Sequence, residues 1–284
     1  MSVTVKAPAK INLVLDVVGR RDDGYHLLET VFQTVDWYDH IAVDVADEMQ
    51  VLCNGGAPQD ESNTAYRAAM LFRQHTARNE CYRIVIKKQI PMQAGLAGGS
   101  ADAAGVLLAL NRLTGADLSL DALCKLGAKI GADVPFCIRG GTALGTGTGT
   151  ELQPLPAFDK GCLVIVKPSG GVSTPEAYRL VDGKANLFHP SARAFCEALQ
   201  NGDFAGMAAA VGNSFEDALC LTDSLAARER LLQNGADAAC MSGSGSAVFG
   251  LFALRETAER CAAALSDHYA HVRVCRPCGG IVFD

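Results

Sequence analysis

The sequence predicts an α+β protein of two domains, and three observations carry this prediction. The chain has 284 residues, where one domain usually has roughly 100–200. In the second half, strand-like and helix-like segments follow one another in a pattern that favours an antiparallel sheet. Pro154 and Pro156 precede a new strand, so we expect domains at residues 1–156 and 157–284. Hydrophobic residues make up 49% of the chain, which is enough for a core in each domain.

The N-terminal half is predicted to contain both strands and helices. The turn signal Arg21-Asp22-Asp23-Gly24 ends the first strand or pair of strands. Alternating apolar residues, rich in Val and Ile, predict strands at residues 2–15, 27–35, 41–45 and 82–90. Apolar residues at helical spacing predict helices at residues 63–75, 101–113 and 120–130, and Thr114-Gly115 is a typical stop for the second.

The C-terminal half alternates between the two kinds of element. Strands are expected at residues 162–168, 247–252 and 271–275. Helices are expected at residues 191–199, 225–234 and 257–266. Between the halves, the glycines and threonines of residues 131–156 indicate turns between short strands. We interpret the Gly-Thr repeat at residues 145–150 as a flexible hairpin.

Charge and apolar patterning exclude several function classes. The net charge is -6 without a basic stripe, which argues against nucleic-acid binding. The longest lysine cluster, Lys87-Lys88, is interpreted as solvated surface charge. No apolar run reaches the ~18 residues of a membrane span, and the N-terminus lacks an export signal, so we expect a cytoplasmic protein with reduced cysteines. The pair Cys275 and Cys278 lacks a second pair of metal ligands, so a strand end or turn is expected there.

Glycines crowd the start of one predicted helix. Gly95, Gly98 and Gly99 precede Ser100 and a strongly apolar segment. The first turn of a helix has unpaired N–H groups, and bare backbone lets phosphate oxygens approach them. Ser100 suits the N-cap position. A tight strand-to-helix connection explains the glycines equally well, and the spacing fits neither a Walker A loop nor a dinucleotide fingerprint.

A second glycine–serine loop lies in the other half of the chain. Its N–H groups could form an anion nest, although a plain loop is the simpler interpretation. Two such loops, one in each half, fit a phosphate that is held in a cleft between domains. The residues of this second loop are Ser242, Gly243, Ser244 and Gly245.

Three motifs together resemble the GHMP small-molecule kinases. Residues 6–13 look like the N-terminal motif of that family, residues 91–104 like its ATP-phosphate loop and residues 242–245 like its C-terminal motif. Ala94 and Ala97 depart from the family pattern, because glycine is common at both positions. Three further segments, residues 20–26, 131–136 and 173–178, are similar to the branch that phosphorylates a cytidine diphosphate-linked methylerythritol.

The resemblance implies a fold and a set of functional residues. The N-terminal domain would resemble domain 2 of ribosomal protein S5, the C-terminal domain would be ferredoxin-like, and the active site would lie in the cleft between them. ATP would be the phosphate donor, together with Mg²⁺. The sequence indicates neither the ligands of Mg²⁺ nor the oligomeric state. Asn12 would bind the acceptor substrate. The expected ATP-binding residues are Pro91, Met92, Gln93, Ala94, Gly95, Leu96, Ala97, Gly98, Gly99, Ser100 and Ala101.

Lys10 and Asp133 are the candidate catalytic residues. Both lie in apolar segments, where an unpaired charge is costly, so a pair between them would satisfy both. Taken from the residues alone, a structural ion pair and a catalytic pair are equally good explanations. The resemblance favours catalysis, with Asp133 accepting or orienting the proton of the substrate hydroxyl.

Three ring side chains are candidates for recognition of the substrate base. Tyr25, His26 and Tyr178 come from different halves of the chain, and a planar base can stack between aromatic side chains. An exposed turn at Tyr25-His26 is the alternative. Rival functions are another GHMP kinase, acting on homoserine, mevalonate or a sugar, and a catalytically silent nucleotide-binding regulator.

Overall fold

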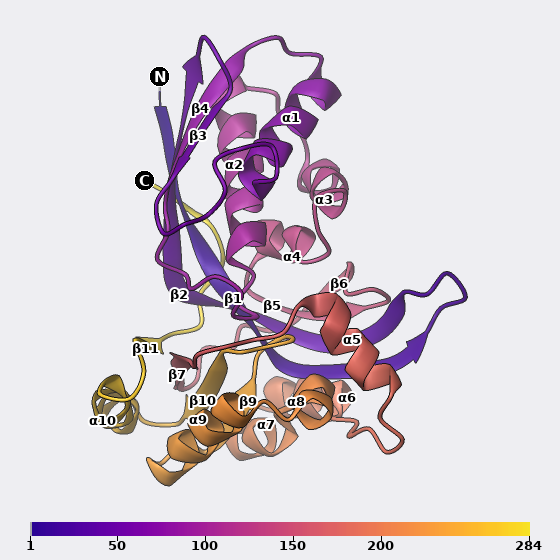
Figure 1. Cartoon of the computed structure of the whole chain (residues 1–284), viewed down its shortest axis with the longest axis vertical. Coiled ribbons are helices and arrows are strands. Elements are labelled where there is room, and N and C mark those ends of the chain that lie inside the picture. The colour runs from indigo at the N-terminus through magenta and orange to yellow at the C-terminus, as the bar shows by residue number, and fades with distance from the viewer. Residues whose placement is uncertain (1) are drawn as a thin grey trace.

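The computed structural model describes residues 2–284 and contains two mixed layers of helices and strands (Figure 1). The larger sheet has eight strands in the order β12-β1-β2-β4-β3, with β5 and β6 continuing from β2, and β8 beside β1. Its strands are β1 (Ser2–Arg20), β2 (His26–Ala46), β3 (Gln50–Cys53), β4 (Cys81–Lys87), β5 (Thr142–Thr146), β6 (Glu151–Pro154), β8 (Gly212–Asn213) and β12 (Val282–Phe283).

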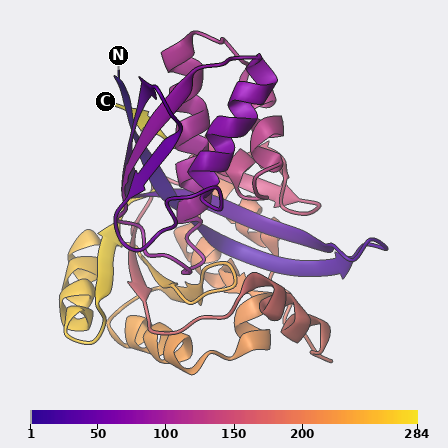
Figure 2. The ribbon, with the colours of Figure 1, turned by 45° about the horizontal axis from the view of Figure 1, so that its top comes forward.

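Strands β1 and β2 form one long antiparallel hairpin. They pair from Ser2 opposite Asp44 to Arg20 opposite His26, with register shifts after Pro8, Asn12 and Val17. The sequence predicted two shorter strands in place of β2, whereas the shifts let a single strand bend and continue. The far end of the hairpin extends past the helices, as Figure 2 shows.

Four helices cover one face of the larger sheet (Figure 1). Helix α2 is central and buried, and Gly105 lets it approach β2: a Cβ at Gly105 would lie 2.6 Å from Ile41 Cδ1. The sequence predicted the first three helices and missed the fourth, placing turns there instead. The helices are α1 (Thr64–Thr76), α2 (Gly98–Thr114), α3 (Leu120–Ala128) and α4 (Val134–Arg139).

The C-terminal part is built on a four-stranded antiparallel sheet in the order β11-β7-β10-β9. This arrangement confirms the α+β class and the antiparallel second sheet. Its strands are β7 (Cys162–Lys167), β9 (Ala238–Met241), β10 (Val248–Phe252) and β11 (His271–Cys275). Its helices are α5 (Thr174–Asp182), α6 (Ala192–Gln200), α7 (Phe204–Ala210), α8 (Ser214–Leu219), α9 (Thr222–Gln233) and α10 (Arg255–Ser266).

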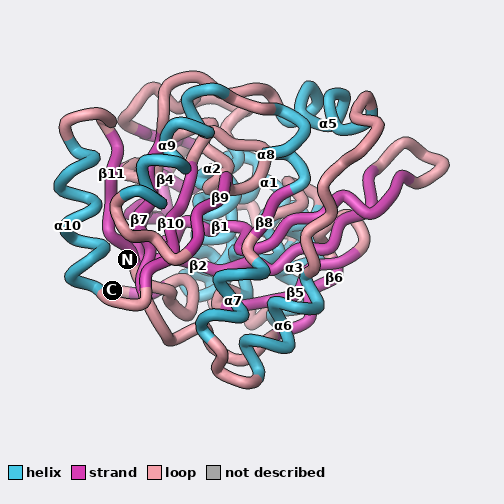
Figure 3. The backbone as a smooth tube through the Cα atoms, turned by 90° about the horizontal axis from the view of Figure 1, so that it is seen from below, coloured by secondary structure: helices cyan, strands magenta, loops and turns pink. Residues whose placement is uncertain are grey.

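The two parts interlock through the edges of the larger sheet. Strands β8 and β12 come from the C-terminal half, and both pair with β1. Seen from below, α5 and α10 lie at opposite ends of the C-terminal part (Figure 3). The division between residues 156 and 157 stays a prediction. Within residues 2–284, no helix is long and apolar enough to cross a membrane.

Candidate active site

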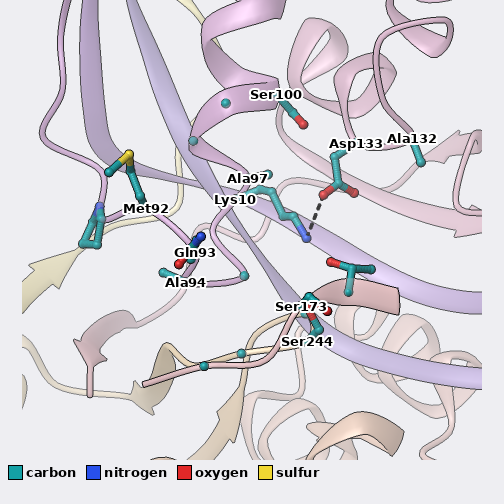
Figure 4. A pocket seen from close by; sticks show the side chains of 18 of the residues that line it. Lys10, Met92, Gln93, Ala94, Ala97, Ser100, Ala132, Asp133, Ser173 and Ser244 are labelled. Carbon is teal, nitrogen blue, oxygen red and sulfur yellow. Dashed lines mark ion pairs between the residues drawn. The ribbon is translucent and has the colours of Figure 1, made fainter. Parts of the chain in front are cut away.

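A cavity of about 990 Å³ lies between the two parts of the molecule (Figure 4). Its wall is built from β1, the loop before α2, the residues before α4, the β5–β6 turn, the segment before α5 and the second glycine loop. Most of the predicted site residues line it. They are Lys10, Asn12, Pro91, Met92, Gln93, Ala94, Gly95, Ala97, Gly98, Gly99, Ser100, Asp133, Tyr178, Gly243, Ser244 and Gly245.

Lys10 projects from β1 into this cavity, although its side chain is only 5% exposed. Its ammonium donates to Asn12 Oδ1 at 2.7 Å and lies 5.3 Å from the centre of the Phe32 ring. Asn12 is held in turn, because its amide nitrogen donates to Thr30 Oγ1 at 2.8 Å. These contacts fix the position of a buried positive charge.

Asp133 lies next to Lys10 in the cavity. The distance from Lys10 Nζ to Asp133 Oδ2 is 3.4 Å, and the Asp133 side chain is 35% exposed. Asp133 occupies the N-cap position of α4, yet its carboxylate accepts no bond from that helix. Ser119 and Ser173 show the usual arrangement, in which the side chain caps its own helix. The Asp133 carboxylate therefore stays available to a ligand.

Helix α2 points its N-terminus at the cavity. It begins at Gly98, so the unpaired N–H groups of its first turn belong to Gly98, Gly99 and Ser100. The prediction that Ser100 is the N-cap is wrong. Ala97 occupies that position with a φ of 55°, in the left-handed region, and makes no side-chain cap bond. This conformation explains why glycine suits position 97. Figure 4 shows Ser100 on the same side as Asp133.

Contacts within the protein require glycine at position 95 and favour it at positions 98 and 99. A Cβ at Gly95, whose φ is +73°, would lie 1.9 Å from the carbonyl oxygen of Ser242. A Cβ at Gly98 would lie 3.1 Å from Lys88 Nζ, and one at Gly99 would lie 3.3 Å from Thr64 Oγ1. Close packing thus accounts for these glycines, and the same bare backbone leaves the first turn of α2 open to the cavity.

The second glycine loop is tied to both β1 and the first loop. Ser242 Oγ accepts from the backbone N–H of Asn12 at 3.3 Å and donates to the carbonyl of Gly95 at 3.0 Å. Asn213, at the end of β8, donates to the carbonyls of Met241 and Gly243 at 2.7 and 2.8 Å. The two loops therefore form one unit, and neither is a flexible connection.

Lys88 lies beneath the first turn of α2. Its ammonium bridges the carboxylates of Asp39 and Asp102, the latter at 2.7 Å, and its side chain is only 7% exposed. The interpretation of Lys88 as solvated surface charge is wrong, because its ammonium is buried between two carboxylates, one of which, Asp39, is 49 residues away in the sequence. Burial raises the pKa of Asp102, and nearby Asp39 adds to this, while Lys88 opposes it. Asp102 Oδ1 is buried without a hydrogen-bond partner among the described residues.

Two of the three rings predicted to hold a base stack on each other. His26 stacks directly on Tyr178, with ring centroids 4.3 Å apart and planes 17° apart, so no base fits between them. Tyr25 is 66% exposed at the hairpin end. Phe215 packs edge-on against Tyr178 at 5.0 Å. Burial, reinforced by Asp133, raises the pKa of the Tyr178 hydroxyl to about 12, which keeps it neutral.

Several cavity residues were not foreseen from the sequence. Thr148 and Gly149, in the repeat interpreted as a flexible hairpin, line the cavity together with Phe32 and Lys167. No local signal marks them, because β5 pairs with β2 and only that pairing brings the turn to the site. Among residues 2–284, no cluster of three or more His, Cys, Asp or Glu side chains could hold a metal ion.

Comparison with known proteins gives a consistent result. The GHMP kinases N terminal domain family matches residues 63–141, and the GHMP kinases C terminal family matches residues 195–271. A 4-diphosphocytidyl-2-C-methyl-D-erythritol kinase of Moorella thermoacetica is 44% identical over 281 residues, covering 96% of this chain and 98% of the relative. A protein of the same name from Geobacillus sp. is 44% identical over 256 residues, covering 88% of each chain.

Solved structures extend this comparison. A crystal structure of 4-(cytidine 5'-diphospho)-2C-methyl-D-erythritol kinase has a TM-score of 0.82 and 36% identity, covering 98% of this chain and 100% of that one. A homoserine kinase from Cytophaga hutchinsonii has a TM-score of 0.79 at 20% identity, covering 100% of this chain and 97% of that one. The second likeness concerns the fold alone.

Proposed function

The chain belongs to the GHMP kinase family, and we propose that it transfers the γ-phosphate of ATP to the 2-hydroxyl of 4-diphosphocytidyl-2-C-methyl-D-erythritol. The observation that carries this proposal is the position of Lys10 and Asp133. A partly exposed carboxylate and a buried ammonium meet in the cavity into which α2 points its N-terminus. The Asp133 carboxylate caps no helix and is 35% exposed in the cavity, which argues against a purely structural pair and thus against a catalytically silent regulator.

In the proposed reaction, the substrate hydroxyl oxygen attacks the γ-phosphorus while the bond to the leaving oxygen of ADP breaks. Asp133 orients the hydroxyl and accepts its proton. Lys10, which Asn12 holds at 2.7 Å, positions the carboxylate of Asp133 and stabilises negative charge on the transferred group. Phosphoryl transfer depends mainly on positioning and electrostatics, which suits a buried and fully restrained lysine.

The phosphates of ATP are proposed to bind between the two glycine loops. The free N–H groups of Gly98, Gly99 and Ser100 supply donors at the positive end of the α2 dipole. Gly243, Ser244 and Gly245 of the second loop also line the cavity. Mg²⁺ would be bound together with ATP and would neutralise charge on the phosphates, because this ion keeps several waters and binds mainly through substrate phosphates. Ser100, which lines the cavity at the start of α2, is the side chain that would hold it.

Recognition of the cytidine group is assigned to the far end of the β1–β2 hairpin. His26 and Tyr178 are stacked there, and Tyr25 is exposed beside them. Because no base fits between His26 and Tyr178, the base approaches His26 by its edge and stacks on an outer ring face. The predicted cytoplasmic location and the lack of nucleic-acid binding stay predictions.

The test is ATP turnover with a panel of acceptors. The cytidine substrate should be phosphorylated with a kcat/KM far above the values for homoserine, mevalonate, a sugar and the uridine analogue. Equal use of the cytidine and uridine compounds would contradict the assigned base site. Turnover of homoserine or mevalonate alone would replace the proposal by one of the rival kinase activities.

A further inference from the structure

Asp182, at the C-terminal end of α5, holds the imidazole of His26. The distance from His26 Nε2 to Asp182 Oδ1 is 2.6 Å, and the His26 side chain is only 9% exposed. Arg20 lies 3.2 Å from the other carboxylate oxygen of Asp182 and also donates to the carbonyl of Gly24 at 3.2 Å. Stacking on Tyr178 fixes the plane of the ring. Both the position and the rotation of His26 are therefore restrained.

This contact determines which ring nitrogen carries the proton. An ionised carboxylate can only accept hydrogen bonds, so Nε2 of His26 must be the donor to Asp182. A neutral imidazole has a single N–H, and Nδ1 is then an acceptor. Within the part of the chain that the structure describes, the His26 side chain makes no hydrogen bond other than the one to Asp182. The free lone pair of Nδ1 is thus the recognition group that remains.

We propose that Asp182 is a positioning residue that makes His26 Nδ1 an acceptor for the exocyclic amino group of the substrate pyrimidine. This inference rests on the proposed function. Cytosine carries an amino donor at C4, where uracil carries a carbonyl oxygen. With uracil, two acceptors would face each other and stay unpaired. Loss of such a pairing lowers discrimination by about 5- to 150-fold.

The decisive variant is Asp182→Asn. Arg20 has only donors, so it selects the amide oxygen of the new side chain and turns the NH₂ group toward His26. Nε2 then becomes the acceptor, and the proton moves to Nδ1. We expect the cytidine-over-uridine ratio of kcat/KM to fall by about 5- to 150-fold while the KM for ATP is unchanged. Glu176→Gln, on the same helix and in an ion pair with Arg179, should keep the wild-type ratio.

A second measurement separates this role from a structural one. In ¹⁵N-histidine-labelled protein, the imidazole shifts report which nitrogen is protonated, and His26→Gln identifies the His26 signals. We expect the Nε2–H form in the wild type and the Nδ1–H form in Asp182→Asn. An unchanged tautomer, or a changed tautomer with an unchanged base preference, would overturn the inference. A wild type that does not phosphorylate the cytidine compound at all would instead overturn the proposed function.

Discussion

Replacing Gly95 by alanine should separate the two glycine loops. The added Cβ would lie 1.9 Å from the Ser242 carbonyl oxygen, where contacts under 3.0 Å essentially never occur. The loops must therefore move apart by about 1 Å. The φ of +73° adds roughly 1–2 kcal/mol of strain for a side chain, and overpacking adds about 1–3 kcal/mol. A displacement of about 1 Å near reacting groups costs about 10²-fold in rate.

The assay compares kcat/KM for ATP with the free energy of unfolding, measured below the unfolding temperature of every variant. Gly95→Ala should lose about 100-fold in kcat/KM and about 2–5 kcal/mol in stability. Gly115→Ala is the matched control, because Gly115 has a φ of +58° with nothing within 4 Å of its added Cβ. That control should lose stability through strain alone. If both variants kept wild-type kcat/KM, contact between the loops would be irrelevant to ATP.

Three further predictions concern charged and titrating groups. Asp133→Asn should lower turnover by about 10²–10⁴-fold in a folded protein, and near-normal turnover would contradict its catalytic role. The raised pKa of Tyr178, about 12, should make the unfolding free energy fall by up to about 2 kcal/mol as the pH rises from about 10 to about 12, because the folded state retains the proton there. Tyr178→Phe should flatten this part of the pH profile of unfolding, and an unchanged slope would show that other groups cause it. Lys88→Met should lower the free energy of unfolding by about 3–5 kcal/mol, because it leaves the buried carboxylates of Asp39 and Asp102 without a cation. Denaturant titrations measure this loss, and a value below about 1 kcal/mol would contradict the prediction.

Local patterns in the sequence were sufficient to predict many of the helices and strands. The strand predicted at residues 271–275 coincides with β11, and the helix predicted at residues 63–75 differs from α1 by one residue at each end. Asn63 caps α1 through a bond from the N–H of Ala65, as its side chain chemistry favours. Such features depend on neighbours within a few residues, which a sequence displays directly.

Features that depend on distant partners were not predictable in this way. Lys88 resembles surface charge until Asp39 is brought from β2, and Thr148 resembles a flexible turn until β5 pairs with β2. Helix α4 has only six residues and starts with Val134-Pro135, so it shows too little periodicity to be recognised. The contact between Lys10 and Asp133 was foreseen because each charge alone would be costly in an apolar segment.

The β1–β2 hairpin fixes the distance between the reacting groups and the site proposed for the base. Lys10 lies midway along β1, and Arg20 and His26 pair at its far end, so reaction and recognition are positioned on the same two strands. At about 3.3 Å per residue, the segment from Lys10 to Arg20 spans at most about 33 Å. Lengthening both strands by two residues would preserve which side chains face the cavity, whereas a single added residue would invert them. Acceptors of different size could thus be selected by hairpin length, while Lys10 and its partners remain unchanged.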